Sequence, residues 1–131
     1  MTVTFFDRQI EGNAMNGSKF ANSESLIEAL QGLQSRESFF CELHGERSKL
    51  LVGLGSQRSC VQYSALNGDP PYLMAMGVNR KDDQGELSFL IGDTATPVPS
   101  RYALLEAELR AVIESFVETE TASPKLDWEE I

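Results

Sequence analysis

Hydrophobic and polar positions alternate along most of this chain in short runs that are rich in β-branched and aromatic residues. Runs of this kind, bounded by Gly, Asn and Pro, predict β-strands. The predicted strands are residues 2–6, 39–43, 49–54, 59–63, 72–76 and 87–91. Residues 11–22 hold several Gly and Asn residues, which predict a loop, and Pro97 and Pro99 are expected to end the strand region.

Two segments show the 3.6-residue period of amphipathic helices instead. The first helix is predicted over residues 23–35, with Ser25 and Glu28 available for a capping box. The second is predicted over residues 101–118, and its apolar stripe is expected to be buried against the sheet. The two stripes consist of Leu26, Ile27, Leu30 and Leu33, and of Leu105, Leu109, Val112 and Phe116.

The chain closes on residues 126–131, where apolar and acidic residues alternate. This period of two predicts a half-buried strand at the edge of a sheet. Short strands in meander order, with one helix before most of them and one after, favour the α+β class. We therefore expect an antiparallel sheet of about five to seven strands with two main helices packed on it, as one domain over residues 1–131.

Composition changes this picture through its charge. The chain has 131 residues, with 20 acidic and 11 basic side chains and a net charge of −9. Residues 1–65 carry a net charge of −1, and residues 66–131 carry −8. Nucleic acid and anionic membranes both need a cationic face, so the charge argues against direct binding to either and favours a basic protein partner. A solvated acidic tail that maintains solubility is the alternative interpretation.

The sequence offers little for catalysis. Cys41 and His44 are three residues apart on one predicted strand, so their side chains should point to opposite faces, and pairing of His44 with Cys60 depends on an unknown strand register. One histidine and two separated cysteines do not make a zinc site, and no cofactor motif is complete. We expect no enzyme activity, metal or cofactor; a pocket holding His44, or a cysteine with a lowered pKa, would favour an enzyme.

The chain is expected to be cytoplasmic. It lacks an apolar run of the roughly 18 residues that a membrane span needs, and residues 1–4 have no signal-peptide character. Cys41 and Cys60 lie inside apolar strand-like runs, where free thiols behave as small hydrophobic groups. A disulfide between them is the less favoured state in a reducing compartment.

The order of several segments resembles one known family. The segments are residues 49–55, 61–63, 67–72, 97–99, 116–117, 123–124 and 126–130. This order is similar to that of the deaminase-associated immunity proteins of bacterial polymorphic toxin systems, over residues 25–131. The family's closing Trp-x-Glu pattern corresponds to Trp128 and Glu130, whereas Glu120 and Thr121 stand where the family has a glycine.

The resemblance implies a small cytosolic protein that binds and neutralises one toxin domain, often a nucleic-acid deaminase and sometimes a nuclease. Acidic residues predicted to lie in loops, at a helix end or on the edge strand are the candidates for contact with a cationic toxin. They are Asp82, Asp83, Glu118, Glu120, Glu129 and Glu130. Trp128 is expected either to anchor the last strand in the core or to contact the toxin.

A secretion chaperone or effector-binding adaptor is the alternative function. Such proteins are also small, acidic and without catalytic residues. Because they usually dimerise through an apolar helix face, a stable homodimer would favour them over an immunity protein.

Overall fold

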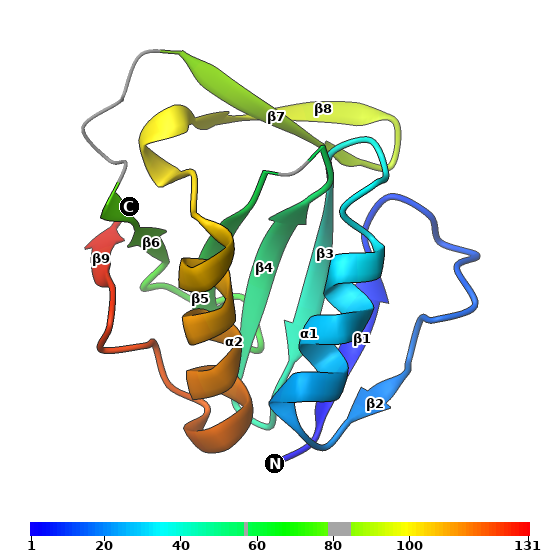
Figure 1. Ribbon diagram of the computed structural model, residues 1–131, viewed down its shortest axis with the longest axis vertical. Coiled ribbons are helices and arrows are strands. Elements are labelled where there is room, and N and C mark those ends of the chain that lie inside the picture. Colours follow the sequence, from blue (N-terminus) through cyan, green and yellow to red (C-terminus); the bar gives the residue numbers. More distant parts are fainter. Residues whose placement is uncertain (57, 79–84) are drawn as a thin grey trace.

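The computed structural model describes residues 1–56, 58–78 and 85–131, and within them two α-helices pack on one face of a nine-stranded sheet (Figure 1). The α+β class is thereby confirmed. The helices are α1 (Ser23–Gly32) and α2 (Glu106–Thr119). The strands are β1 (Val3–Asp7), β2 (Lys19–Phe20), β3 (Phe39–His44), β4 (Ser48–Leu54), β5 (Cys60–Ala65), β6 (Leu73–Met76), β7 (Glu86–Ile91), β8 (Thr94–Pro99) and β9 (Asp127–Glu130).

The main run of strands has the order β2-β1-β3-β4-β5-β6-β9, and all its pairs are antiparallel. The strand β7 joins β3 in parallel through Phe39 and Leu90, and β8 pairs only with β7. The last strand, β9, lies beside β6 at the edge of the sheet, as the alternation of residues 126–131 predicts.

The main core lies between the sheet and the helix layer. Side chains of β1, β3, β4 and β5 that point to this face alternate with outward ones, and they meet the buried faces of α1 and α2. The two helices run in opposite directions side by side (Figure 1). The large side chains that are fully enclosed in this core include Phe5, Phe39, Leu43, Leu50, Ile113 and Phe116.

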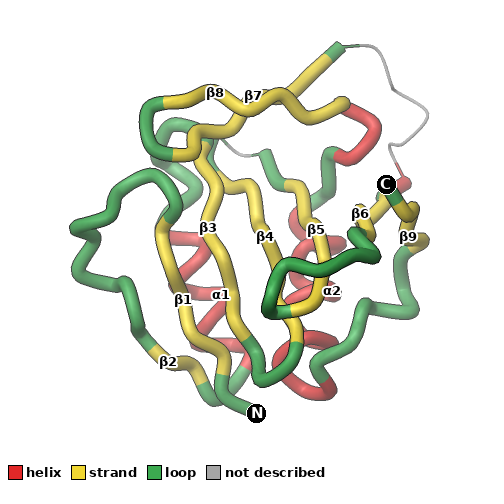
Figure 2. The backbone as a smooth tube through the Cα atoms, turned by 180° about the vertical axis from the view of Figure 1, so that it is seen from behind, coloured by secondary structure: helices red, strands yellow, loops and turns green. Residues whose placement is uncertain are grey.

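A second core lies on the opposite face of the sheet. The β7–β8 hairpin crosses one end of that face (Figure 2), where Leu87, Phe89 and Val98 cover apolar residues of the central strands. Phe40 and Phe89 stack at a centroid distance of 5.1 Å. The remainder of this face is not covered by the hairpin and carries polar side chains of β3, β4 and β5.

The first helix begins at Ser23 as predicted, but its end and both ends of the second helix differ from the prediction. The first ends at Gly32, and its N-cap is Asn22, whose Oδ1 accepts a hydrogen bond from the backbone of Ser25 at 2.9 Å. Asn22 therefore caps the helix in place of the predicted Ser25, because asparagine and serine are equally favourable at the N-cap position.

The second helix begins at Glu106, after a 3₁₀ turn over Ser100–Tyr102. Leu105 is therefore its N-cap and is 45% exposed, so the expectation that this residue is buried was wrong. Leu104 is buried in its place, whereas the expected burial of Leu109, Val112 and Phe116 is confirmed. The predicted stripe therefore begins one residue before the helix does.

The nine strands exceed the expected five to seven because β2 and β8 were missed. The strand β8 contains Pro97 and Pro99, which were expected to end the strand region. Proline lacks an N–H donor but is tolerated in a strand that has a partner on one side only, and β8 has β7 alone. The strand β2 has two residues within the predicted loop.

Candidate functional site

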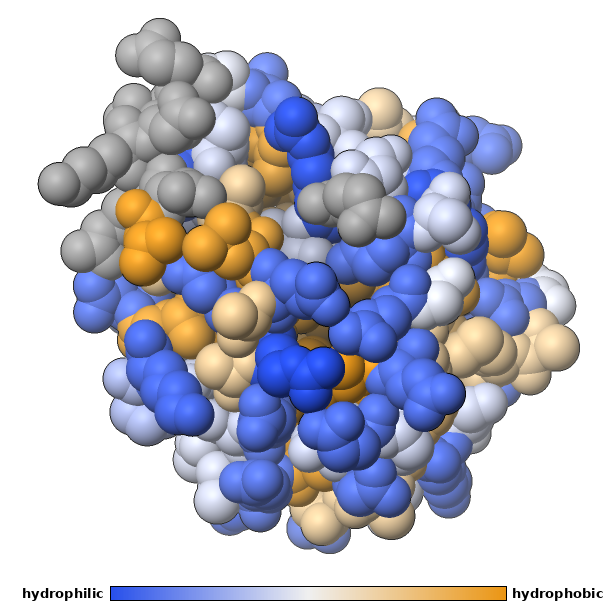
Figure 3. All heavy atoms as spheres, in the orientation of Figure 1, coloured by the Kyte–Doolittle hydropathy of each residue, from blue (hydrophilic) through white to orange (hydrophobic). Residues whose placement is uncertain are grey.

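The outward surface of the helix layer is strongly acidic. Together α1 and α2 contain six glutamates and one basic residue, Arg110. Four of these carboxylates, on Glu24, Glu28, Glu114 and Glu118, occupy helix positions away from the buried ones, and the fifth, on Glu106, is exposed at the start of α2. We call this surface the acidic helix face and define it by Glu24, Glu28, Glu106, Glu114 and Glu118. Figure 3 looks onto it and shows hydrophilic side chains over most of the layer.

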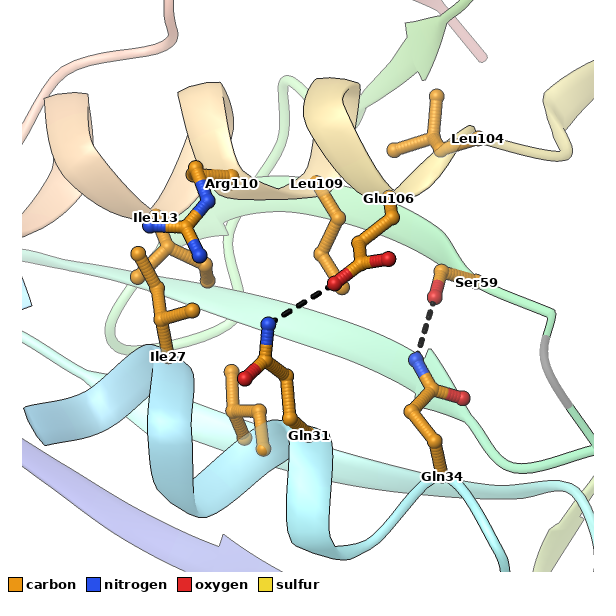
Figure 4. A pocket seen from close by; sticks show the side chains of 10 residues that line it. Ile27, Gln31, Gln34, Ser59, Leu104, Glu106, Leu109, Arg110 and Ile113 are labelled. Carbon is orange, nitrogen blue, oxygen red and sulfur yellow. Dashed lines mark hydrogen bonds between the residues drawn. The ribbon is translucent and has the colours of Figure 1, made fainter. Parts of the chain in front are cut away.

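A groove of about 280 Å³ runs between the two helices within this face. Its floor is apolar and consists of Ile27, Leu30, Leu104, Leu109 and Ile113. Its rim is polar and comes from both helices and from the loop before β5 (Figure 4). The volume is at the lower limit of the roughly 300–1,000 Å³ typical of small-molecule sites, so the groove suits one long side chain better than a large substrate.

Hydrogen bonds cross the groove at two places. The Gln31 amide donates to Glu106 Oε1 at 2.8 Å, and the Gln34 amide donates to Ser59 Oγ at 3.0 Å (Figure 4). Gln34 also accepts from the backbone of Gly55 at 2.9 Å, which fixes its orientation. The first bond joins α1 to α2, and the second joins the segment after α1 to the loop before β5.

The groove's basic residue is already paired. Arg110 Nη1 lies 3.0 Å from Glu24 Oε1, and both side chains are well exposed to solvent. An exposed pair of this kind contributes about 0–1 kcal/mol. The pair neutralises one carboxylate at one end of the groove and leaves the carboxylate of Glu106 at the other end without a cation among the described residues.

The acidic residues proposed from the sequence do not form one surface. Asp82 and Asp83 lie outside the described residues. Glu118 is exposed near the end of α2 and belongs to the acidic helix face. Glu129 and Glu130 are adjacent on β9, so they point to opposite faces of the sheet.

Glu120 is used inside the molecule. It ends α2 in the left-handed conformation, with φ of 54°, and its carboxylate reaches the turn between β3 and β4. It accepts hydrogen bonds from the backbone of Glu46 at 2.6 Å and of Arg47 at 3.0 Å, and from Ser48 Oγ at 2.9 Å. Burial raises the pKa of this carboxyl, but these donors lower it more, so the pKa lies below its ordinary value.

Glu129 also has partners within the chain. Its carboxylate accepts a hydrogen bond from the Tyr102 hydroxyl and pairs with Arg101 at 3.0 Å. Burial and the adjacent carboxylate together raise the pKa of Tyr102. Since this carboxylate closes β9 against the 3₁₀ turn, it has a role in the fold in addition to any surface role.

Trp128 packs against the main core from the edge strand. Its ring meets that of Tyr63 edge-on at a centroid distance of 6.3 Å, and its Nε1 donates to the carbonyl oxygen of Ser123 at 2.9 Å. The indole is only partly buried. This arrangement satisfies the polar end of the indole and leaves part of its ring at the surface.

The two cysteines are buried and lie apart from His44, which lines an open hollow beside Glu42 on the far face of the sheet. Cys41 lies in the main core and Cys60 in the second core, both as free thiols, and His44 lies on the sheet face opposite Cys41. Burial raises the pKa of Cys60 to about 12 and that of Cys41 further, which is opposite to the shift of a reactive cysteine. Among the described residues, no group of three or more His, Cys, Asp or Glu side chains could hold a metal, and no helix is long and apolar enough to cross a membrane.

Positive charge gathers on the other side of the molecule. On the sheet face away from the helices, Glu42 is surrounded by Arg8 at 3.5 Å, His44 at 2.7 Å and Lys49 at 3.7 Å. The acidic helix face and this cationic cluster therefore lie on opposite sides of the sheet.

Among the five residues of the acidic helix face, sequence reasoning proposed only Glu118 as a contact. It divided the charge into two halves of the chain, and Glu24 and Glu28 lie in the half whose charges nearly cancel. Their i, i+4 spacing on the polar side of a predicted helix was the available signal. That α1 lies beside α2 depends on the packing of the sheet, which no local pattern reveals.

The fold and the acidic helix face fit a small domain that binds another protein. Residues 21–130 match the family model described as Immunity protein Imm1. The chain belongs to the Imm1 immunity protein family, which confirms the resemblance to immunity proteins drawn from the sequence, and membership implies a toxin as its partner. A search of curated proteins found no match.

Proposed function

We propose that this protein neutralises a cognate toxin that acts on nucleic acid, a deaminase or a nuclease, by binding the cationic surface of the toxin in the cytoplasm. It acts as a binding protein without catalysis, and it needs neither a cofactor nor contact with nucleic acid or a membrane. Membership of the immunity protein family supports the partner's class. The acidic helix face supports the charge of the partner.

The observation that carries the electrostatic part is the charge of the helix layer. Six glutamates against one arginine give α1 and α2 a net charge of −5, more than half of the chain's −9. A protein that acts on DNA or RNA has a cationic surface for the phosphates. An anionic surface of the immunity protein competes for that surface, and long-range attraction raises association rates by about 10–10³-fold.

The distribution of charge supports binding with the helix layer facing the toxin. A cationic toxin attracts the acidic helix face and repels Arg8 and Lys49 on the opposite side of the sheet. The molecule therefore turns its helix layer toward the toxin before contact is made. Glu118 belongs to this surface, and Glu130, Asp82 and Asp83 remain predicted contacts, whereas Glu120 and Glu129 act mainly through their partners within the fold.

The apolar positions of α2 argue against the chaperone or adaptor alternative. Leu109, Val112 and Phe116 are buried against the sheet of the same molecule, so this helix face is not free to form a dimer. The large apolar side chains that are exposed among the described residues lie on separate segments. They are Met1, Ile10, Val78, Leu105 and Ile131.

The direct test is co-expression in bacteria with the toxin domain whose gene adjoins that of this chain. We expect growth to be restored by the wild-type chain, and an equimolar complex to form with a catalytically inactive toxin domain. Assays of the active toxin on DNA and on RNA then identify its chemistry. A stable homodimer that neither binds the toxin domain nor restores growth would favour the chaperone alternative and overturn the proposal.

A further inference from the structure

We infer that the groove between α1 and α2 receives an arginine side chain of the toxin. The inference rests on the proposed function, because it names the group of the toxin that this surface anchors. The proposed function rests on a long-range attraction between net charges. The inference goes further because it assigns one specific contact to the groove. Three features of the groove support it: its floor, its rim and its own arginine.

The floor accepts an aliphatic stem. Leu30 is 2% exposed, Ile113 is fully buried, and Leu109 is 7% exposed, so the floor is continuous with the main core. Side chains of arginine and lysine bury their methylene groups on such surfaces while the charged end stays at the polar rim. A groove of about 280 Å³ leaves room for one stem of this length.

The rim presents acceptors that are not fully used. Glu106 Oε1 accepts from the Gln31 amide, and this is the one hydrogen bond to the Glu106 carboxylate within the described part of the chain. The carboxylate stands in the first turn of α2. The carbonyl oxygen of the Gln31 side chain stands on the same rim (Figure 4). A rim of acceptors requires a ligand that carries donors.

The groove's own arginine shows that this environment accommodates a guanidinium group. Arg110 extends from α2 toward Ile27 of α1 (Figure 4) and is held by Glu24 at 3.0 Å. The other end of the groove repeats the combination of apolar floor and carboxylate with Leu109 and Glu106, but there the chain supplies an amide in place of a cation. An arginine of the toxin would pair with Glu106 at the second end of the groove, as Arg110 pairs with Glu24 at the first.

Arginine suits the rim better than lysine. Its planar group carries five donors in fixed directions, and it can bind the carboxylate and the Gln31 oxygen together, whereas lysine offers a compact charge with stronger hydration. A charge-assisted contact of this geometry also gives specificity. An acidic side chain is repelled by Glu106, and an apolar one leaves the rim without donors.

The first test needs no toxin. The probe is N-acetyl-arginine methylamide, added to isotope-labelled protein and followed by the NMR signals of the Ile27, Leu109 and Ile113 methyl groups. We expect saturable shifts at these methyl groups in the millimolar range, weaker ones with the lysine analogue, and none with the norleucine analogue. Shifts that do not saturate, or that match those caused by sodium chloride, would overturn the inference. Equal binding of the lysine analogue would overturn the choice of arginine.

Two charge-neutral variants locate the effect. Glu106→Gln keeps the shape of the rim and removes its charge, whereas Glu118→Gln removes a charge from the same helix away from the groove. We expect Glu106→Gln to weaken probe binding about tenfold, as for one charge-assisted hydrogen bond, and Glu118→Gln to leave it nearly unchanged. Equal losses in the two variants would mean that the probe senses the overall field and not the groove.

The inactive toxin domain then separates this inference from the proposed function. An anchored contact acts on dissociation, whereas a charge at the rim of an interface acts on association. We expect Glu106→Gln to speed dissociation about tenfold and Glu118→Gln to change the association rate alone. If both variants alter only association, the groove inference fails while the proposed function stands; if the wild-type chain does not bind the toxin, the proposed function fails as well.

Discussion

Glu120 accepts a hydrogen bond at 2.6 Å from the backbone N–H of Glu46, which lies 74 residues earlier in the chain. The contact joins the end of α2 to the turn between β3 and β4, so a helix of the outer layer is fixed to two central strands. Tyr63 of β5 donates to the backbone carbonyl of Glu120 at 3.0 Å and adds a third strand. A carboxylate proposed from the sequence as a toxin contact thus ties the helix layer to the sheet.

Glu120→Gln is expected to lower the free energy of unfolding by about 1–2 kcal/mol, since it weakens charge-assisted hydrogen bonds in a partly solvated turn. Glu118→Gln, two residues earlier and exposed, is expected to change it by less than about 0.5 kcal/mol. Urea denaturation at neutral pH measures both. A stable Glu120→Gln variant that binds the toxin more slowly would return this residue to the docking surface.

Phe116 and Leu105 test where α2 begins. Phe116 is fully buried, so Phe116→Ala is expected to cost about 3–5 kcal/mol of stability. Leu105 is 45% exposed, so Leu105→Ala should cost less than about 0.5 kcal/mol, although both residues share the predicted apolar stripe. Chemical denaturation of the two variants gives the comparison. Similar large losses would mean that the helix extends through Leu105.

Trp128 is expected to act mainly through the fold. Trp128→Ala should cost about 3 kcal/mol, the lower end of the range for large aromatic residues, because the indole is partly exposed. Trp128→Phe keeps the contact with Tyr63, loses the hydrogen bond to Ser123, and should cost about 1 kcal/mol. Melting temperatures and toxin affinity are measured together. An unchanged melting temperature with loss of toxin binding would assign Trp128 to the interface.

Asp7 gives a pH dependence. Burial raises the pKa of Asp7, but hydrogen bonds from Arg36, Asn13 and nearby backbone groups lower it more, so the folded pKa lies below the ordinary value of 3.8. Protonation is therefore harder in the folded state, and the stability that Asp7 contributes is present above pH 3.8 and is lost as the pH falls through the folded pKa.

Asp7→Asn is accordingly expected to cost about 3 kcal/mol at neutral pH, because it leaves Arg36 without its carboxylate at 2.7 Å. The difference from the wild type should shrink in acid, where Asp7 is protonated. Denaturation curves from neutral pH down to about pH 3 measure this. A difference that stays constant over the whole range would show that Asp7 contributes by packing and not by its charge.

The periodicity of the chain predicts much of the fold. Seven strands, both helices and the burial of Leu109, Val112 and Phe116 follow from the spacing of apolar residues. The start of α2 does not follow, because Leu105 is an apolar residue in the N-cap position, where a polar residue normally marks the boundary. The strand β8 was missed because its prolines are tolerated only through its place at an edge.

The candidate site was less predictable for a similar reason. The charge of Glu118 and its exposed helical position are visible in the sequence, but the internal roles of Glu120 and Glu129 arise from segments distant in the chain. The groove exists because α1 and α2 pack side by side. Their neighbouring positions depend on the order of the strands in the sheet beneath them, which local sequence patterns do not reveal. Contacts between distant segments therefore decide which acidic side chains are exposed at the surface and which are bound within the fold.

The central claim is that the acidic helix face guides a cationic toxin to this protein. The measurement is the association rate of the inactive toxin domain at two ionic strengths, for the wild type and for a variant with Glu24, Glu28, Glu114 and Glu118 all changed to Gln. Glu11→Gln, in the loop between β1 and β2, is the control for a carboxylate outside this face. We expect the fourfold variant to associate about tenfold more slowly at low salt and to lose most of its salt dependence, with the control unchanged. Association rates and salt dependence equal to those of the wild type would contradict the claim.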